Sequence, residues 1–324
     1  MDIYVKKAII HQFSPDDTDL YLADKLLNIT PKIEEYLRKK IERVYSDEAR
    51  TGIFEEDNPF LEMISDDLLE TSVAVANRWK EEFVVSENQK TNDLVFVQFS
   101  KEGVDHFAFL RIALRETLTH LGGEGDNPIK LTQNNLPGFG TGADEALVIN
   151  LQSRKYHLIE KRIKYNGTFL NYFSENLLQT QPKISPKKSI KALEKTAQKI
   201  AESFNTDDFQ FQSKVKSAIF NHIEEENKLS PEKLADDLFD DNLTARLSFI
   251  DQVKEAVPEP VTFEEIDASR QLKKFENQKL SLSNGIELIV PNNVYEDAES
   301  VEFILNDNGT YSILIKNIED IQSK

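Results

Sequence analysis

Four stretches in the first half of the chain are apolar in the manner of β-strands, and together they predict a sheet. Residues 94–99 (LVFVQF) and 107–112 (FAFLRI) are nearly continuous apolar runs, which are typical of strands buried on both faces. The short link at 101–103 favours an antiparallel hairpin between them. Residues 5–13 and 146–151 predict two further strands.

Apolar residues at helical spacing predict helices between these strands. Thr30 precedes Pro31 in the order expected of an N-cap and a first helical residue. The spacing that follows predicts a helix to about Tyr45. A second helical stretch covers residues 60–82, with a break expected near Thr71. We therefore expect a largely antiparallel sheet covered by helices.

Two proline-containing stretches predict the boundaries between segments of different secondary structure. Residues 179–186 and 256–261 each contain two prolines, and proline fixes φ and lacks the amide donor that regular structure requires. We expect them to separate an N-terminal α+β domain, a helical segment and a small C-terminal β-rich segment, with the bounds 1–180, 185–256 and 262–324. The fold class is accordingly α+β.

Local signals support the two C-terminal segments. Ser-Pro pairs at 185–186 and 230–231 are typical helix starts. Asn-Gly pairs at 284–285 and 308–309 are typical of tight hairpin turns. Around the second Asn-Gly pair, apolar residues alternate with polar ones over much of 301–315, which predicts a terminal hairpin.

Composition narrows the class of protein. The chain has 324 residues, 39 basic and 57 acidic side chains, a net charge of −18 and no cysteine. The lack of cysteine excludes disulfides, thiolate metal sites and a cysteine nucleophile. No apolar run reaches the roughly 18 residues of a membrane-spanning helix, and the N-terminus lacks the order of a secretory signal. We therefore expect a cytoplasmic protein that makes no contact with a membrane.

The charge is distributed unevenly along the chain. Residues 151–200 carry 11 basic and 3 acidic side chains, a net charge of +8, whereas residues 1–150 carry −12. Because salt screens charge over about 8 Å at physiological ionic strength, the basic stretch can face a polyanion although the whole chain is acidic. The alternative is that its basic side chains pair with acidic groups inside the protein.

The most informative part of the basic stretch is a helix predicted from Pro186 to Phe204. Its apolar residues recur every three or four positions and form one stripe, and lysines at steps of four lie on the opposite side. Lys187 and Lys188 occupy the first turn, where the helix dipole disfavours cations. Positive charge placed against the local field indicates an external anion. A solvated helix face is the alternative interpretation.

Basic residues upstream extend this positive stretch, with Tyr156 and Tyr165 interleaved. The combination suits contacts with phosphates more than the reading of bases. The candidate DNA-binding residues are Arg154, Lys155, Lys161, Arg162, Lys164, Lys187, Lys188, Lys191, Lys195 and Lys199.

Other motifs give weaker signals. The glycine-rich residues 136–142 precede a strand instead of opening a helix, so they predict a mobile connecting loop and not a phosphate-binding loop. The histidines are scattered and predict no metal site. Asp144, Glu145 and the pair Glu160-Lys161 come nearest to a metal-dependent nuclease, but adjacent residues of a strand point to opposite faces. We expect no catalytic residue, no cofactor and no metal.

Parts of the first 175 residues or so resemble a known family. These parts are AIIHQF at 8–13, RVYS at 43–46, GIF at 52–54, and the region from Asp144 through VINL at 148–151 to GTFLNYF at 167–173. They are similar to the bacterial 37-kDa nucleoid-associated protein family, the NdpA-like proteins, and the chain mass of 37.2 kDa agrees. The resemblance implies DNA binding and a place in the nucleoid, and it carries no catalytic signature.

Three functional hypotheses follow from these patterns. The leading one is a nucleoid-associated protein that binds duplex DNA with little sequence preference, through residues 154–199. A homodimer is compatible with it, because two such surfaces would bind more tightly than one. The second is an adaptor whose basic helix docks on chromosome-maintenance proteins, which the acidic total favours. The third, a metal-dependent nuclease, lacks support from the motifs.

Overall fold

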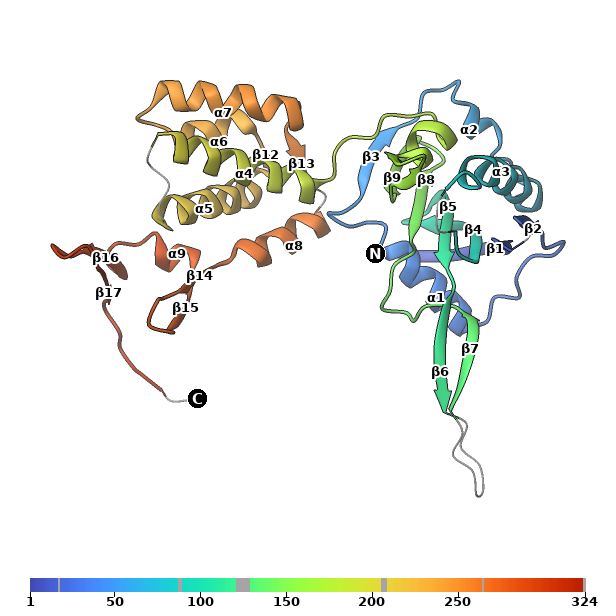
Figure 1. The fold of residues 1–324 in the computed structure, drawn as a ribbon, viewed down its shortest axis with the longest axis horizontal. Coiled ribbons are helices and arrows are strands. Elements are labelled where there is room, and N and C mark those ends of the chain that lie inside the picture. Colours follow the sequence, from blue (N-terminus) through green and yellow to red (C-terminus); the bar gives the residue numbers. More distant parts are fainter. Residues whose placement is uncertain (17, 87–88, 121–128, 205–208, 264, 323–324) are drawn as a thin grey trace, which may run out of the picture. The chain divides into compact units, whose positions relative to one another are not determined.

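The apolar runs of the first half of the chain become strands of one antiparallel sheet in the computed structural model (Figure 1). The structure describes residues 1–16, 18–86, 89–120, 129–204, 209–263 and 265–322. The seven strands of this sheet take the order β2-β1-β4-β5-β8-β9-β3. Their bounds are β1 Ile3–Ser14, β2 Asp19–Tyr21, β3 Arg50–Ile53, β4 Asn92–Lys101, β5 Val104–Ala113, β8 Glu145–Asn150 and β9 Lys155–Ile159. The predicted strands correspond to β1, β4, β5 and β8 and are confirmed.

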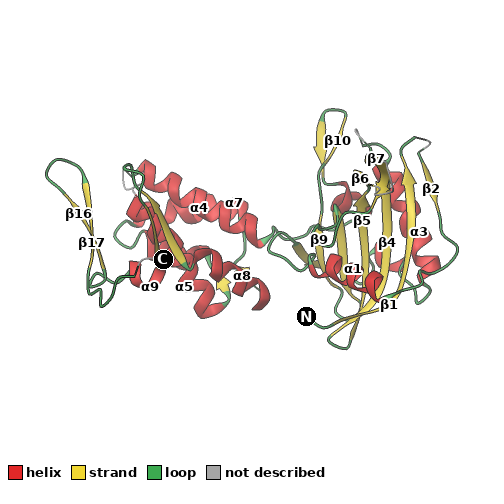
Figure 2. Cartoon of the chain, turned by 90° about the horizontal axis from the view of Figure 1, so that it is seen from below, coloured by secondary structure: helices red, strands yellow, loops and turns green. Residues whose placement is uncertain are grey.

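This sheet is buried on both faces because its central strands are apolar at consecutive positions. On β4, Phe96 belongs to one hydrophobic core, whereas its neighbours Val95 and Val97 belong to another. Helix α3 and the π-helix η1 pack on the Phe96 face, and α1 packs on the Val97 face (Figure 2). The helices of this part of the chain are α1 Pro31–Glu42, α2 Pro59–Glu62, α3 Leu68–Phe83 and η1 Phe173–Leu177.

The second helical stretch is broken, but at a different place from the one predicted. The break lies between α2 and α3 and ends at Asp67, which caps α3 by accepting a hydrogen bond from the Leu69 amide at 2.8 Å. Thr71 lies inside α3 instead of at the break. Its hydroxyl accepts a hydrogen bond from the Ser65 amide at 2.9 Å, which ties the first turn of α3 to the break before it. Thr30 caps α1 as predicted.

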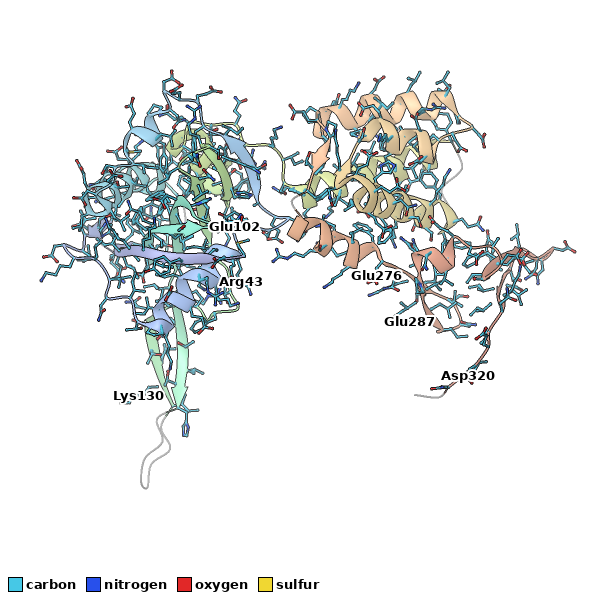
Figure 3. All side chains as sticks on the ribbon, turned by 180° about the vertical axis from the view of Figure 1, so that it is seen from behind. Arg43, Glu102, Lys130, Glu276, Glu287 and Asp320 are labelled. Carbon is cyan, nitrogen blue, oxygen red and sulfur yellow. The ribbon has the colours of Figure 1, made fainter. Side chains whose placement is uncertain are left out.

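A two-stranded arm projects from this sheet (Figure 1). It consists of β6 Arg115–His120 and β7 Ile129–Asn135, paired so that Leu118 lies opposite Leu131. Both leucines are exposed, and Figure 3 labels Lys130 on the same arm. A smaller antiparallel hairpin, β10 Ile163–Tyr165 and β11 Thr168–Leu170, follows β9.

The chain divides into two units, Met1–Ser185 and Pro186–Lys324. The second unit has its own hydrophobic core, formed by residues from Ile190 to Ala268 and supplied mainly by helices. Its helices up to the predicted boundary are α4 Pro186–Ser203, α5 Phe209–Glu226, α6 Pro231–Leu238 and α7 Leu243–Ala256. The strands β12 Lys228–Leu229 and β13 Val261–Thr262 form a short antiparallel pair.

The end of the chain contains hairpins, as predicted, and also a helix that the sequence analysis missed. The hairpins are β14 Asn277–Ser281 with β15 Glu287–Pro291, and β16 Val301–Leu305 with β17 Tyr311–Ile315; a one-turn helix, α9 Asn292–Tyr295, lies between them. The missed helix is α8 Glu265–Phe275. Ala268, Leu272 and Phe275 recur at helical spacing and pack against the helical core, which is why this segment folds with the helices. Helices and strands in these proportions confirm the α+β fold class.

Candidate nucleic-acid interface

Helix α4 has the amphipathic arrangement that its sequence predicts. Ile190, Leu193, Ala197 and Ile200 are buried in the core of the second unit. The candidate lysines on the opposite side, Lys187, Lys188, Lys191, Lys195 and Lys199, are all exposed. At 100° per residue, these five lysines span an arc of about 120° on the helix. They therefore form one cationic face, which we call the α4 lysine face.

At the centre of the α4 lysine face, Glu194 interacts with Lys191 through its charge without forming an ion pair. Within the residues that the structure describes, no ion pair joins Lys188, Lys191 or Lys195 to an acidic side chain. Lys199 donates a hydrogen bond to the neutral amide oxygen of Gln252 at 2.9 Å. Glu194, on the same helix, is partly buried, and burial raises the pKa of its carboxyl although Lys216 and Lys191 act in the opposite direction.

The upstream candidates lie in the first unit and are more closely paired. Lys155 begins β9, Lys164 belongs to β10, and both are exposed. Arg154 approaches Glu56 at 3.6 Å, and the Lys161 ammonium donates to Asp144 at 2.7 Å. Arg154 and Lys161 thus each have an acidic partner within the first unit, as the alternative interpretation of the basic stretch expects.

The two tyrosines interleaved with the basic residues differ in their exposure to solvent. Tyr156 is fully buried, packs against Phe54, and shares a hydrogen bond with Thr180 at 2.9 Å. It therefore cannot contact DNA. Tyr165 is 40% exposed, and Phe169 on the paired strand is 60% exposed. The sequence analysis missed Phe169, because a strand of three residues is too short to reveal which side chains face the solvent.

The carboxylates considered for a nuclease are all engaged in contacts within the first unit. Glu145 is fully buried and accepts a hydrogen bond from Arg111 at 2.6 Å. Burial tends to raise the pKa of Asp144, but hydrogen bonds from Lys161 and from the Ala113 amide hold it below the ordinary value. Glu160 pairs with Arg50. Within the described ranges, no three side chains of the metal-binding types come together as a metal site would require.

The buried Glu145 is part of a chain of hydrogen bonds through the core of the first unit. The Tyr172 hydroxyl donates to Glu145, and the Trp79 indole donates to the Tyr172 oxygen at 3.0 Å. Burial and the charge of Glu145 raise the pKa of Tyr172 well above its ordinary value. This network joins α3 and η1 to the sheet, and its three side chains, Glu145, Tyr172 and Trp79, are fully buried. We interpret it as structural.

The glycine-rich loop leads into β8, as predicted, but one buried lysine fastens it, which argues against the mobility that was expected of it. The Lys40 ammonium donates to the backbone oxygens of Pro137, Gly138 and Thr141. The Tyr36 ring lies beside this ammonium, 4.5 Å from it. The carbonyl oxygens of this loop thus bind a cation of the protein itself. In a phosphate-binding loop, by contrast, backbone amides face an anion.

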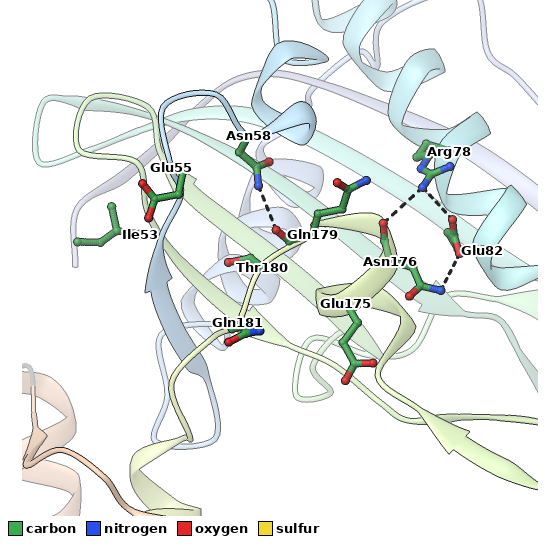
Figure 4. Close-up of a pocket in the computed structure, with 10 residues that line it drawn as sticks. All are labelled: Ile53, Glu55, Asn58, Arg78, Glu82, Glu175, Asn176, Gln179, Thr180 and Gln181. Carbon is green, nitrogen blue, oxygen red and sulfur yellow. Dashed lines mark hydrogen bonds and ion pairs between the residues drawn. The ribbon is translucent and has the colours of Figure 1, made fainter.

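A polar cavity of about 810 Å³ lies in the first unit, beside β3, α3 and η1 (Figure 4). Its charged lining residues are Glu55, Arg78, Glu82 and Glu175. Arg78 pairs with Glu82 at 2.9 Å, so the remaining charge is acidic. Phosphate would be repelled there, and we therefore do not include this cavity in the candidate interface.

These observations define an α+β protein with a helical second unit that carries an exposed cationic face. A family model described as NA37, nucleoid-associated protein YejK, matches residues 9–321. The chain therefore belongs to this family of nucleoid-associated proteins, and the resemblance read from its sequence is confirmed. No curated protein matches the chain.

The family supports the coarser part of the functional expectation. Its description is that of a nucleoid-associated protein and not of an enzyme class, which agrees with the expectation of a bacterial protein located at the nucleoid. No helix in the described ranges is long and apolar enough to cross a bilayer.

Proposed function

We propose that this chain binds duplex DNA through phosphate contacts, with little sequence preference and without catalysis, in the nucleoid of the cytoplasm. The observation that carries the proposal is the α4 lysine face, whose central lysines are exposed and form no ion pair among the described residues. Family membership supports association with the nucleoid. The contact surface proposed from α4 consists of Lys187, Lys188, Lys191, Lys195 and Lys199, with Lys155, Arg162 and Lys164 of the first unit as additional contacts.

The dimensions of the lysine face suit a nucleic-acid backbone. From Lys187 to Lys199 the helix rises about 18 Å, and one DNA strand carries a phosphate about every 3.4 Å of axis, so roughly five phosphates lie along this length. Neutralising phosphates releases condensed counterions, which is the main source of affinity in binding without base contacts. A homodimer would present two such faces to one duplex.

The net charge of −18 does not oppose this proposal. Charges separated by more than about 8 Å are largely screened at physiological ionic strength. The acidic side chains would repel DNA from other parts of the surface and so direct it to the lysine face.

The test is a salt titration of duplex DNA binding for the wild type and for the triple variant Lys187→Gln, Lys191→Gln and Lys195→Gln. For six to eight phosphate contacts we expect a log–log slope of about −5 to −7 in the wild type, and a slope less steep by about 3 in the variant. A matched control replaces three other exposed lysines, Lys25, Lys32 and Lys90, by glutamine. This control has the same net charge as the variant and should keep the wild-type slope.

Each alternative function predicts a different result in the same experiment. If the chain is an adaptor for chromosome-maintenance proteins, neither the wild type nor the variant should bind DNA. The acidic net charge of the chain favours this second candidate, and so do exposed apolar residues of the terminal hairpin, Leu305, Tyr311 and Ile315. Cleavage of the duplex only when Mg²⁺ is added would establish a nuclease. Equal slopes in the triple variant and in the wild type would overturn the assignment to α4.

A further inference from the structure

The small hairpin formed by β10 and β11 stands apart from the main sheet of the first unit (Figure 2). Its two strands pair in register, with Lys164 opposite Phe169 and Tyr165 opposite Thr168. Asn166 and Gly167 form the turn and both have positive φ, 47° and 78°. Two central residues with positive φ give the tight turn that matches the twist of a hairpin. The hairpin is therefore a short projection with a tight turn.

The two faces of this hairpin differ in their surroundings. Ile163 and Leu170 lie opposite each other and pack on the core beneath, where Ile163 is only 7% exposed. Directly opposed residues of antiparallel strands point to the same side, and their neighbours along each strand point to the other side. Lys164 and Phe169 therefore share the outer face. A phenylalanine that is 60% exposed leaves much of its side chain in water, and burying that apolar surface against a ligand is favourable.

The segment that carries the exposed ring is cationic, although one of its cations, Lys161, pairs with Asp144. The residues from Lys161 to Ser174 include Lys161, Arg162 and Lys164 and no acidic residue. Arg162 precedes Lys164 by two positions and donates to the side-chain oxygen of Asn171 at 3.3 Å. The nearest acidic residues along the chain have internal partners, because Glu160 pairs with Arg50 and Glu175 accepts from Asn171. An apolar ring among cations is complementary to a ligand that offers flat apolar surfaces between anionic groups.

We propose that Phe169 is a wedge that inserts between two stacked base pairs of duplex DNA, while Arg162 and Lys164 contact the phosphates beside it. This inference rests on the proposed DNA binding and names the element that deforms the duplex. Apolar side chains inserted at a base step unstack it partially and kink the duplex by about 20–90°. The second exposed aromatic residue, Tyr165, lies on the other face of the hairpin. The two rings therefore do not form the row of stacking platforms that a single-strand site uses.

The experiment measures binding and base unstacking separately, on the full-length chain. Duplexes carry 2-aminopurine, whose fluorescence rises when the base unstacks, and a donor–acceptor pair at the two ends to report bending. The variants are Phe169→Ser, Phe169→Leu to retain an apolar wedge, and Tyr165→Ser as the matched control on the opposite face. Thermal unfolding of each variant establishes that it is folded.

For the wild type we expect salt-dependent binding, a rise in 2-aminopurine fluorescence and a shorter end-to-end distance. Phe169→Ser should lose the fluorescence rise and the bend, bind about 5- to 100-fold more weakly, and keep the wild-type salt slope, because no phosphate contact is removed. Phe169→Leu should retain part of the rise, and Tyr165→Ser should behave like the wild type.

The outcomes distinguish this inference from the proposed function. If the wild type does not bind duplex DNA at any salt concentration, the proposed function fails and the wedge with it. If the wild type binds with the expected salt slope but gives no fluorescence rise, or if Phe169→Ser unstacks the duplex as well as the wild type does, only the wedge is refuted. Tighter binding of single strands than of duplex, lost in Phe169→Ser, would also overturn it and indicate a stacking site.

Discussion

Among single residues, Lys40 illustrates how one side chain can organise a loop distant in sequence. Its side chain is fully buried and its ammonium donates to three backbone oxygens between Pro137 and Thr141. Burial, followed by the charges of Arg43 and Arg115, lowers the pKa of Lys40 to about 8. The ammonium is therefore still the main form at neutral pH, and the three carbonyl groups depend on it for their hydrogen bonds.

We predict that Lys40→Met destabilises the protein by about 2–4 kcal/mol, because buried acceptors lose their donor. Urea unfolding at pH 7 measures this change. The control is Lys39→Met, which breaks only an exposed ion pair with Glu42 at 3.4 Å and should cost less than about 1 kcal/mol. Equal midpoints for Lys40→Met and the wild type would contradict the structural role of Lys40.

The pH dependence of this difference has a defined sign. The pKa of Lys40 is about 8 in the folded chain, against the ordinary 10.5. Between these two values the unfolded chain therefore binds more protons than the folded chain, and the stability that Lys40 contributes rises with pH. The gap between wild type and Lys40→Met should accordingly widen as the pH increases from 8 to 10.5.

At the scale of elements, local signals were sufficient where the apolar pattern of an element is regular along its whole length. The apolar runs of β4 and β5 predicted both strands, since consecutive apolar residues are stable only when both faces are covered, and the short link at 101–103 predicted their antiparallel pairing. The phase of α4 was predictable for the same reason, because its buried stripe repeats over several turns. Two features were not predicted: the eleven-residue helix α8 was missed, and the break before α3 was placed at Thr71 instead of before Asp67.

The correct position of that break leads to a prediction about helix capping. Asp67 accepts hydrogen bonds from the Leu69 and Glu70 amides, which otherwise lack partners in the first turn. Asp67→Ala should destabilise the protein by about 1 kcal/mol. The adjacent exposed Asp66 does not cap the helix, and Asp66→Ala should change stability by less than about 0.5 kcal/mol. Guanidinium unfolding of both variants compares them; a larger loss for Asp66→Ala would show that the cap is misassigned.

At the scale of the whole molecule, the chain is two units with separate cores. The cores of the first unit contain residues from Ile3 to Leu178, and the core of the second contains residues from Ile190 to Ala268. The sequence analysis expected a boundary in the proline-containing residues 179–186, which include the division between the two units. It also proposed a further division near residue 260. The candidate DNA contacts are divided between the units, five in each.

We predict that the pieces 1–185 and 186–324 fold independently when produced separately. Each should unfold cooperatively on heating, because its apolar side chains are buried within it and none of the three cores crosses the boundary. Circular dichroism and calorimetry test this: the spectra of the two pieces should sum to that of the full chain. An unfolded piece would mean that the units depend on each other.

The sequence by itself determined the α+β class, the central strands, the phase of α4 and the Asn-Gly hairpins, because each follows from a periodicity or a backbone preference within a few neighbouring residues. The tertiary structure alone decided which candidate side chains are available. Tyr156 is buried, and Arg154 and Lys161 have acidic partners far away in the sequence, whereas Phe169 is exposed. The physical reason is that burial and ion pairing depend on contacts between distant segments, which local spacing does not encode.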